Sequence, residues 1–366
     1  MGLKDGTIEI RQFPSNKIIT FSKKHGLTVK SLSLIKSIYS KIPIDSSQTI
    51  NTDLITNEDN NIIFASASCD TVIGIWSFNI IKYKLSIKHL LKGHLHNVSS
   101  ILNLNSYNLI VSGGVDYKIK LWDIQKGNYL GDLGRHNATI NSLILINKNR
   151  FNIDADFIKN QYNSNKEYRS KNNSDEIDNL LYATQINNDL ENMDGVKYEF
   201  NYIIISVGYD KKIKFYGINI DNELELPVLK YTIEVRENIK EDQSLYSSIE
   251  LNNNLTAIGG SRDILVYDFY TMKKAYTISH YNNSALSLNI ICYPYIICGH
   301  DNNSASIYNI EDKELVYTLQ TESKTNYCTL SFNYKYNEEY AEYKINKSYY
   351  FLTGGSNTCN LSIWKC

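Results

Sequence analysis

The amino-acid sequence predicts an all-β protein built from stacked copies of one short unit. A pattern recurs seven times along the 366 residues: a Ser/Gly-rich segment, a tight turn with an acidic or Asn residue, and an alternating segment that ends in an aromatic. Four of the seven histidines also precede similar segments at similar points. A unit of this size cannot bury its own apolar face, so neighbouring copies must stack into one body.

The clearest copy spans residues 110–123, and in it Ser112, Asp116 and Trp122 are separated by four and then six residues. The same spacing recurs in two other copies, as Ser66, Asp70 and Trp76 and as Ser206, Asp210 and Tyr216. Weaker or partial copies occupy 4–10, 259–268, 299–308 and 353–364. In Ile119-Lys120-Leu121 and similar runs, apolar and polar residues alternate, which is typical of a strand with one buried face.

Histidine provides an independent measure of the repeat register. His94 precedes Trp122 by the same distance that separates His280 from Tyr308. His25 and His136 occupy similar positions before their own apolar segments. Because scattered histidines would rarely share one register, the repeat is expected to extend along most of the chain.

These residues resemble the WD40-repeat family, whose two namesake dipeptides correspond to Gly93-His94 and Trp122-Asp123. The resemblance implies a WD40-type β-propeller of four-stranded antiparallel blades, with seven blades favoured, six as the alternative, and an imperfect ring closure. In that family a loop His, a strand Ser, a turn Asp and a strand Trp form a hydrogen-bonded network within a blade. The resemblance places in such networks His25, Ser66, Asp70, Trp76, His94, Ser112, Asp116, Trp122, His136, Ser206, Asp210 and Tyr216. A buried carboxylate and imidazole are costly unless paired, so a complete network should fix the turn.

One long insert interrupts a single domain that is expected to span 1–366. Residues 147–200 are rich in Asn, Asp, Lys and Ser and read as lacking apolar alternation, so we expect disorder, with a short helix near 175–190 as an alternative. Smaller inserts are expected at 35–59 and 334–347. All three fall between the first and second strands of a unit. They should therefore emerge on one face and leave the face of the histidine loops compact.

The two ends of the chain do not match. The start reads as the turn and third strand of a unit, whereas the end stops after a third strand. In a six-bladed ring, strand 17–21 would complete the last blade, but strand 7–11 would have no place. In a seven-bladed ring the chain begins inside a blade, which a misplaced start at Met1 would explain.

Composition excludes several classes of protein. The net charge of −1 gives no sign of nucleic acid or an anionic membrane as a direct ligand. No segment resembles a signal peptide or reaches membrane-spanning length, so we expect an intracellular protein, cytoplasmic or nuclear, without membrane insertion. The six cysteines form no CxxC pair, which fits reduced thiols.

No candidate catalytic group stands apart from the repeat. The repeat register explains His94, and the run 298–301 (Cys-Gly-His-Asp) falls at a strand-turn position. No phosphate-binding loop or metal-ligand spacing is present. We therefore expect no catalytic residue, no metal and no cofactor. The prediction is a non-enzymatic scaffold that binds protein or peptide partners within an intracellular complex.

Two narrower functions and one different class remain as alternatives. The chain could be a subunit of a ubiquitin-ligase or RNA-processing complex, although Gln125 stands where the ligase-linked Trp-Asp-x-Arg motif has Arg. The lipid-binding Phe-Arg-Arg-Gly signature is absent. A propeller hydrolase would need polar side chains in the channel, where the sequence places Ser, Gly and Ala. Exposed aromatic and Arg residues contribute most to interfaces. The partner-binding candidates on the histidine-loop face are Tyr117, Tyr209, Arg262, Arg135, Lys211 and His96.

Overall fold

The computed structural model describes residues 1–12, 15–36, 60–104, 108–154, 197–219, 228–235, 243–251, 254–269, 273–279, 283–321, 326–334, 348–355 and 361–365. Within these ranges the chain forms 25 β-strands in seven antiparallel sheets. Five sheets have four strands, the first has two and the last has three, counted over the described residues. The same residues contain no helix of the length and hydropathy that crossing a bilayer requires.

Most strands are five to eight residues long, and consecutive strands pair with each other. The first three sheets comprise β1 (Thr7–Arg11) and β2 (Ile18–Lys23); β3 (Val29–Lys36), β4 (Asn61–Ser68), β5 (Ile73–Asn79) and β6 (Lys84–Leu91); and β7 (Val98–Asn103), β8 (Leu109–Gly114), β9 (Lys118–Asp123) and β10 (Asn128–Arg135). The next two comprise β11 (Ile140–Asp154), β12 (Lys197–Gly208), β13 (Ile213–Asn219) and β14 (Val228–Val235); and β15 (Leu245–Glu250), β16 (Leu255–Gly260), β17 (Asp263–Asp268) and β18 (Lys273–Ser279). The last two comprise β19 (Ser287–Cys292), β20 (Tyr295–Gly299), β21 (Ser304–Asn309) and β22 (Glu314–Gln320); and β23 (Asn326–Tyr334), β24 (Ser348–Gly355) and β25 (Leu361–Lys365).

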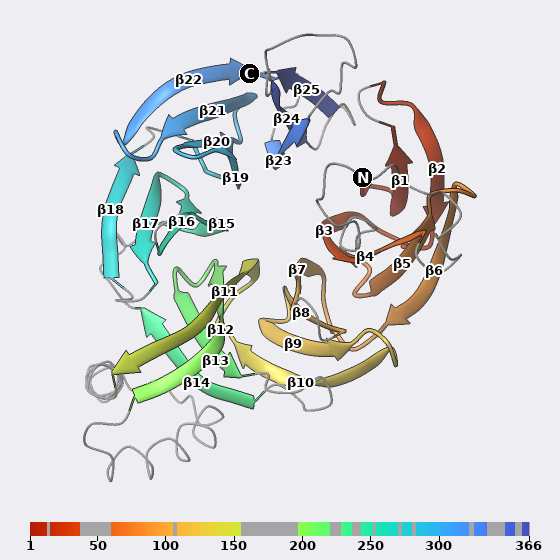
Figure 1. Ribbon diagram of the computed structural model, residues 1–366, viewed down its shortest axis with the longest axis horizontal. Helices are drawn as coiled ribbons and strands as arrows, with labels where there is room; N and C mark the ends of the chain where they lie inside the picture. The colour runs from red at the N-terminus through yellow and green to blue at the C-terminus, as the bar shows by residue number, and fades with distance from the viewer. Residues whose placement is uncertain are drawn as a thin grey trace, which may run out of the picture.

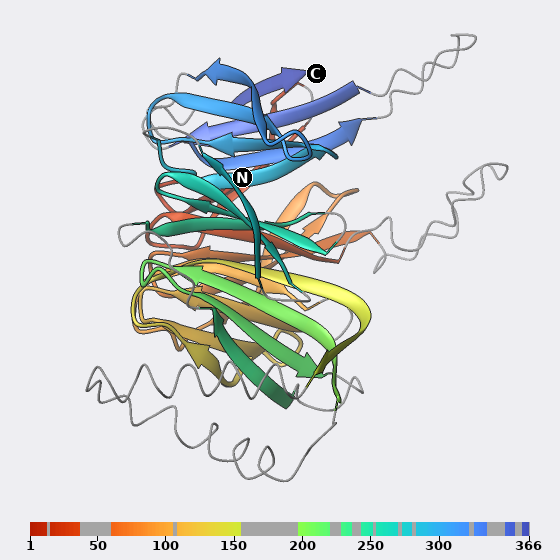
Figure 2. The same cartoon turned by 90° about the vertical axis from the view of Figure 1, so that its left-hand side faces the viewer.

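The sheets are arranged around a ring, with the first strand of each complete sheet innermost and the fourth at the rim (Figure 1). In the side view the sheets stack against one another with their strands crossing the thickness of the ring (Figure 2). Polar side chains join neighbouring innermost strands. Asn141 Nδ2 donates to the Leu245 carbonyl at 2.6 Å, and the hydroxyls of Ser142 and Ser248 lie 2.8 Å apart. This arrangement confirms the expected propeller of four-stranded blades.

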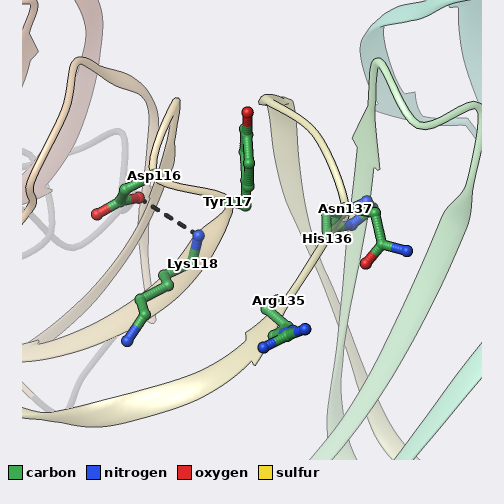
Figure 3. Close-up of a pocket in the computed structure, with 6 residues that line it drawn as sticks. All are labelled: Asp116, Tyr117, Lys118, Arg135, His136 and Asn137. Carbon is green, nitrogen blue, oxygen red and sulfur yellow. Dashed lines mark hydrogen bonds between the residues drawn. The ribbon is translucent and has the colours of Figure 1, made fainter. Parts of the chain in front are cut away.

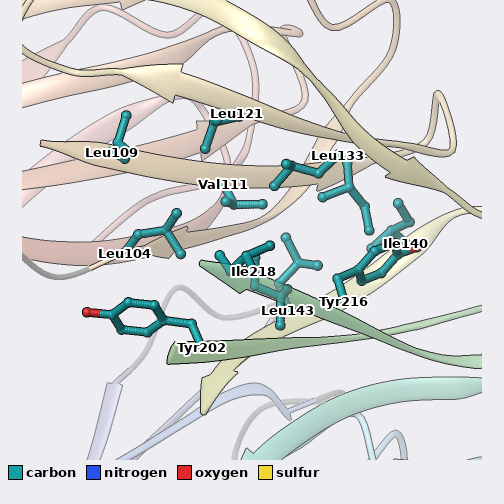
Figure 4. Close-up of a cluster of buried hydrophobic side chains, with 12 residues drawn as sticks. Leu104, Leu109, Val111, Leu121, Leu133, Ile140, Leu143, Tyr202, Tyr216 and Ile218 are labelled. Atoms are coloured by element: carbon teal, nitrogen blue, oxygen red, sulfur yellow. The ribbon is translucent and has the colours of Figure 1, made fainter. Parts of the chain in front are cut away.

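The hydrophobic core lies between neighbouring sheets rather than inside any one of them. Between the sheets β7–β10 and β11–β14, Val111 and Leu121 pack in one buried cluster with Leu143, Ile204 and Tyr216 (Figure 4). Full burial of one such aliphatic side chain stabilises the fold by about 1.5–3 kcal/mol. No single sheet could form this core alone, so stacking of the sheets is what stabilises each repeat.

The first sheet contains β1 and β2 and packs on the outer part of the sheet β3–β6. Ile8 of β1 shares a buried cluster with Val29, Phe64 and Trp76. Segment 7–11 therefore has a place of its own in the ring, as the seven-bladed prediction requires. Among the described residues the two incomplete sheets, β1–β2 and β23–β25, lie at the two ends of the series.

The incomplete first sheet leaves one apolar position uncovered. Leu32, Ile101, Leu143 and Leu288 occupy the same register position on the first strands of four sheets. The last three are 5%, 5% and 6% exposed, whereas Leu32 is 42% exposed. The other three each face the second and third strands of the preceding sheet. In the described part of the chain the sheet before Leu32 consists of β1 and β2 alone, and Leu32 is not part of the buried cluster around Ile8.

The insert predicted at 147–200 has different bounds in the structure. β11 extends to Asp154 and β12 begins at Lys197, and the pairing sets Phe151 opposite Phe200 and Ile153 opposite Tyr198 in sequence register. The prediction overlooked this alternation of apolar and polar residues, which is the pattern of a paired hairpin. β3 likewise extends to Lys36, inside the second expected insert. The remaining parts of the three inserts, and the alternative helix, lie outside the described residues.

Candidate partner-binding face

A chain of four side chains fixes the turn between β8 and β9. The Trp122 indole donates to Ser112 Oγ at 2.7 Å, and Ser112 Oγ lies 2.7 Å from His94 Nε2. His94 Nδ1 lies 2.8 Å from the Asp116 carboxylate. A carboxylate only accepts, so Nδ1–H donates to Asp116, and Nε2 accepts from the Ser112 hydroxyl. Each polar group in this buried chain therefore has a partner of the right kind.

Local sequence explains why the turn takes this form. Gly114 precedes the turn at a point where a Cβ atom would lie 2.3 Å from the Asn97 carbonyl oxygen. Only glycine permits this approach of the histidine loop to the end of β8. The Asp116 carboxylate then accepts from the backbone amides of Leu95 at 3.1 Å and Lys118 at 3.3 Å. Loop and turn are thus joined by one carboxylate.

The same network recurs in the sheets on either side. In the sheet β3–β6, His25 lies 2.9 Å from Asp70 and 2.7 Å from Ser66, which also accepts from the Trp76 indole at 2.7 Å. In the sheet β11–β14, His136 lies 2.9 Å from Asp210 and 2.6 Å from Ser206. The residue after each histidine donates its amide to the aspartate, at 2.8 Å for Gly26 and 3.0 Å for Asn137. The structure joins eleven of the twelve residues that the resemblance assigned to networks, and the twelfth, Tyr216, is buried in the tryptophan position.

The aspartates of these networks remain ionised over a wide pH range. Burial alone would raise the pKa of Asp116, but hydrogen bonds from His94 and from the two backbone amides outweigh it, so the pKa is lowered. The same balance lowers the pKa of Asp210. Burial would also raise the pKa of Asp70, but hydrogen bonds from the amides of Gly26 and Val72 offset it, and the pKa is lowered. The three ionised carboxylates therefore hold the histidine loops in place.

The sheet β19–β22 contains a buried histidine that does not have the repeat spacing. His300, at the end of β20, is buried, and its Nε2 lies 2.9 Å from Ser306 Oγ. His280, which fits the repeat spacing, lies outside the described residues. Burial also raises the pKa of the neighbouring Cys298 thiol, so the Cys-Gly-His-Asp run has the properties of a packed strand end. In β15–β18 the buried Gln243 occupies the loop and donates to the Asp263 carbonyl at 3.1 Å. The sequence predicts a structural strand-turn position for the Cys-Gly-His-Asp run, but it assigns neither His300 nor Gln243 a hydrogen-bonding role, because neither has the register of the other loops.

The networks point inward, and apolar side chains of the same loops point to solvent. Leu95 follows His94 and is 75% exposed, although its amide is held by Asp116. Leu27, Tyr117 and Tyr209 are also exposed on this face. The two leucines were not among the predicted partner residues. Their signal in the sequence is an apolar residue one or two positions after a repeat histidine.

Tyr117 has a backbone conformation that few bulky residues adopt. Its φ angle is +67°, in the left-handed region. Thr71, Lys211 and Asn303 occupy the same turn position in other sheets, with φ angles of +71°, +62° and +62°. The repeat thus imposes this conformation, which Asn or Gly adopts most easily and which costs other residues about 1–2 kcal/mol. Tyr117 in this conformation therefore lowers the stability of the fold.

A pocket of about 340 Å³ opens beside this tyrosine, between the turn after β8 and the loop before β11. It is lined by Asp116, Tyr117, Lys118, Arg135, His136 and Asn137 (Figure 3). In Figure 3 the Tyr117 ring stands at one side of the pocket, and the Arg135 guanidinium lies across from it. Asp116 and His136 belong to the networks and Lys118 pairs with Asp132, so among the residues that the structure describes the Tyr117 ring and the Asn137 side chain are the parts of this lining that no network or ion pair engages.

The other predicted partner residues lie outside this pocket. His96 and Lys211 are exposed in the loop before β7 and the turn after β12, and Arg262 is exposed in the turn between β16 and β17. Tyr209 makes an edge-to-face contact with Tyr246, with ring centroids 5.7 Å apart. Over the described residues, no group of three or more His, Cys, Asp or Glu side chains is placed to hold a metal ion.

Comparison with known proteins adds two findings. Residues 85–123 match the family described as WD40, "WD domain, G-beta repeat". A stretch of 87 residues is 24% identical to "Beige protein homolog 1" of Schizosaccharomyces pombe, and it covers 24% of this chain and 3% of that protein. The chain thus corresponds to a small part of that relative. The matched repeat and the series of four-stranded antiparallel sheets support a WD40-repeat protein, and WD40 repeats indicate a protein-interaction scaffold.

Proposed function

We propose that this chain is a non-enzymatic scaffold within an intracellular complex, in the cytoplasm or nucleus, and that it binds a protein or peptide on the face of its histidine loops. One observation carries the proposal. Three consecutive networks hold these loops in place, and the same loops expose Leu95, Tyr117 and Tyr209. The hydrogen bonds that hold these loops and turns do not involve the side chains of Leu95 and Tyr117, and Tyr209 packs edge-to-face on Tyr246.

Physical chemistry favours such a surface for binding. Ordering a loop or a side chain when a partner binds costs about 0.5–1.5 kcal/mol per side chain, and a loop that is already fixed avoids part of this cost. Aromatic residues near the centre of an interface commonly dominate its energy. Tyr117 adds an exposed aromatic ring at a turn position where Asn would be less strained, so the fold itself does not require this side chain.

The proposal is tested by capture from native cell extract with a triple variant, Tyr117→Ala, Tyr209→Ala and Arg262→Ala. The matched control replaces Tyr83, Tyr317 and Lys88, which are exposed on or next to rim strands. We expect the triple variant to lose one or more partners that the wild type and the control both retain. All three proteins should melt alike, since none of the changes touches a network. Retention of every partner by the triple variant would place the binding site elsewhere.

A further inference from the structure

The charge on the histidine-loop face differs from that of the whole chain. Three histidine loops and four turns form one sector of this face, made up of residues 3–6, 23–28, 69–72, 92–97, 115–118, 135–139 and 209–212. We call these residues the basic sector. They contain eight Lys and Arg against four Asp, a net charge of +4. Because the whole chain has a net charge of −1, the rest of it carries −5.

The solvent-exposed surface of the basic sector is more positive than its net charge of +4 implies. Three of its four aspartates are Asp70, Asp116 and Asp210, each turned into a network with a histidine and backbone amides. Two of its cations already have carboxylate partners: Lys118 lies 2.7 Å from Asp132, and Lys23 lies 3.5 Å from Asp5. The carboxylates therefore act mainly within the fold, while most of the cations stand at its surface.

Lys24 and Lys92 show how the cations are placed. Both are exposed, and neither forms an ion pair with another described residue. Each lies three residues before an exposed leucine on its own histidine loop, Leu27 and Leu95. The pocket beside Tyr117 repeats the combination, with an aromatic wall, Arg135 and the Asn137 amide. Apolar anchors and cations thus alternate across neighbouring loops.

From this placement we infer that the basic sector binds an acidic, extended peptide segment with at least one large apolar side chain. Carboxylates of the segment meet Lys24, Lys92 and Arg135, and its apolar residue contacts the exposed leucines or Tyr117. Charge complementarity of this kind raises the association rate and disfavours partners of the wrong charge. The guanidinium of Arg135 suits a carboxylate, because its N–H groups form a fixed fork. This inference rests on the proposed function and specifies its ligand.

Nucleic acid is the other polyanion that a basic surface attracts, and the anchors argue against it. Nucleic-acid sites combine phosphate-binding cations with aromatic rings on which bases stack. Leu27 and Leu95 are aliphatic, and Leu95 is the most exposed large apolar residue described. Aliphatic anchors gain little from phosphates or bases, but they fit the apolar side chains of a peptide.

Selection from a library of displayed random 12-residue peptides tests the inference on the full chain. Three proteins are compared: the wild type, the double variant Lys24→Glu and Lys92→Glu, and a control, Lys84→Glu and Lys88→Glu. The control makes the same charge change at exposed positions on β6, at the rim. We expect the wild type and the control to enrich peptides rich in Asp and Glu that also carry Leu, Ile, Phe, Tyr or Trp.

Binding of one selected peptide, labelled with fluorescein, is then measured by anisotropy. We expect the test variant to bind about tenfold more weakly and the control to match the wild type. Higher salt should weaken wild-type binding, because exposed charges are screened. A fluorescein-labelled 20-nucleotide polyuridine serves as the nucleic-acid probe. Polyuridine binding that is lost in the test variant, with no acidic peptide selected, would overturn the inference in favour of RNA.

A second variant keeps the inference falsifiable if the charge reversals disturb folding. Tyr117→Asn removes the aromatic side chain at a position where Asn303 shows that asparagine is accommodated. It should melt at or above the wild-type temperature and bind the selected peptide more weakly. Selected peptides that lack acidic bias yet lose binding in Tyr117→Asn would overturn the acidic specificity and leave the proposed function standing. Equal binding by all the variants would overturn the inference outright.

Discussion

Replacing Asp116 by alanine should destabilise the whole propeller by an amount that its contacts define. The carboxylate accepts from His94 Nδ1 at 2.8 Å and from the amides of Leu95 and Lys118. The His94 side chain is 0% exposed, so its Nδ1–H cannot turn to water after the change. A buried donor left without its acceptor costs about 1–3 kcal/mol. The Leu95 amide is nearer the surface, where water can replace the carboxylate, so the total should be about 2 kcal/mol.

Thermal and denaturant unfolding of the purified chain measure this change. Glu314→Ala is the matched control, because it removes an exposed carboxylate on the rim strand β22. Asp116→Asn is the informative intermediate: it keeps an oxygen acceptor for His94 but loses the charge, so it should be destabilised less than the alanine variant. Melting of Asp116→Ala at the wild-type temperature would refute the role assigned to the network. A selective loss of partner binding without any loss of stability would refute it equally.

Three further predictions follow from the fold. Joining β11 to β12 by an Asn-Gly turn in place of 155–196 should leave melting unchanged, because the flanking residues already pair as a hairpin; aggregation of the shortened protein would show that this segment contributes packed structure. Ile101→Ala should cost about 2–5 kcal/mol in denaturant unfolding, whereas Leu32→Ala, at the same register position but 42% exposed, should cost far less; equal losses would mean that Leu32 is covered in solution. Asp132 lies among two lysine ammonium groups and a tyrosine hydroxyl that together outweigh burial and lower its pKa to about 2. Its contribution to stability should be complete above pH 4 and be lost as pH falls toward 2, and the wild type should lose more stability over this interval than Asp132→Asn.

The repeat register was predictable because its physical causes are local. A serine, an aspartate and a tryptophan at fixed spacing form one network per blade, so the sequence pattern and the hydrogen bonds are two views of the same geometry. Where the network changes, prediction fails. His300 follows β20, and its Nε2 lies 2.9 Å from Ser306 Oγ, so its hydrogen bond does not follow the spacing of the three networks.

Features that depend on a neighbouring sheet or strand could not be predicted from the sequence. Leu32 has the same register position as Ile101, but among the described residues the sheet before it has two strands rather than four, and Leu32 is exposed. The length of β11 was underestimated for a related reason. Polar residues dominate its end by composition, but pairing of Ile153 with Tyr198 extends the hairpin into a segment that looked unstructured. The exposure of Leu32 and the length of β11 both depend on other strands of the fold. Local amino-acid composition does not show whether those strands are present.

Fold and surface charge are connected through the turn aspartates. A WD40 blade needs a carboxylate to join its histidine loop to its turn, and the pKa of Asp116 and of Asp210 is lowered because histidine and amide donors surround each one. Each network therefore buries a negative charge just beneath the surface of the loops. Lys24 and Lys92, on the same loops, are exposed and pair with none of these carboxylates. The repetition of one structural device across three blades thus produces a continuous face whose fixed anions are enclosed and whose cations are presented outward.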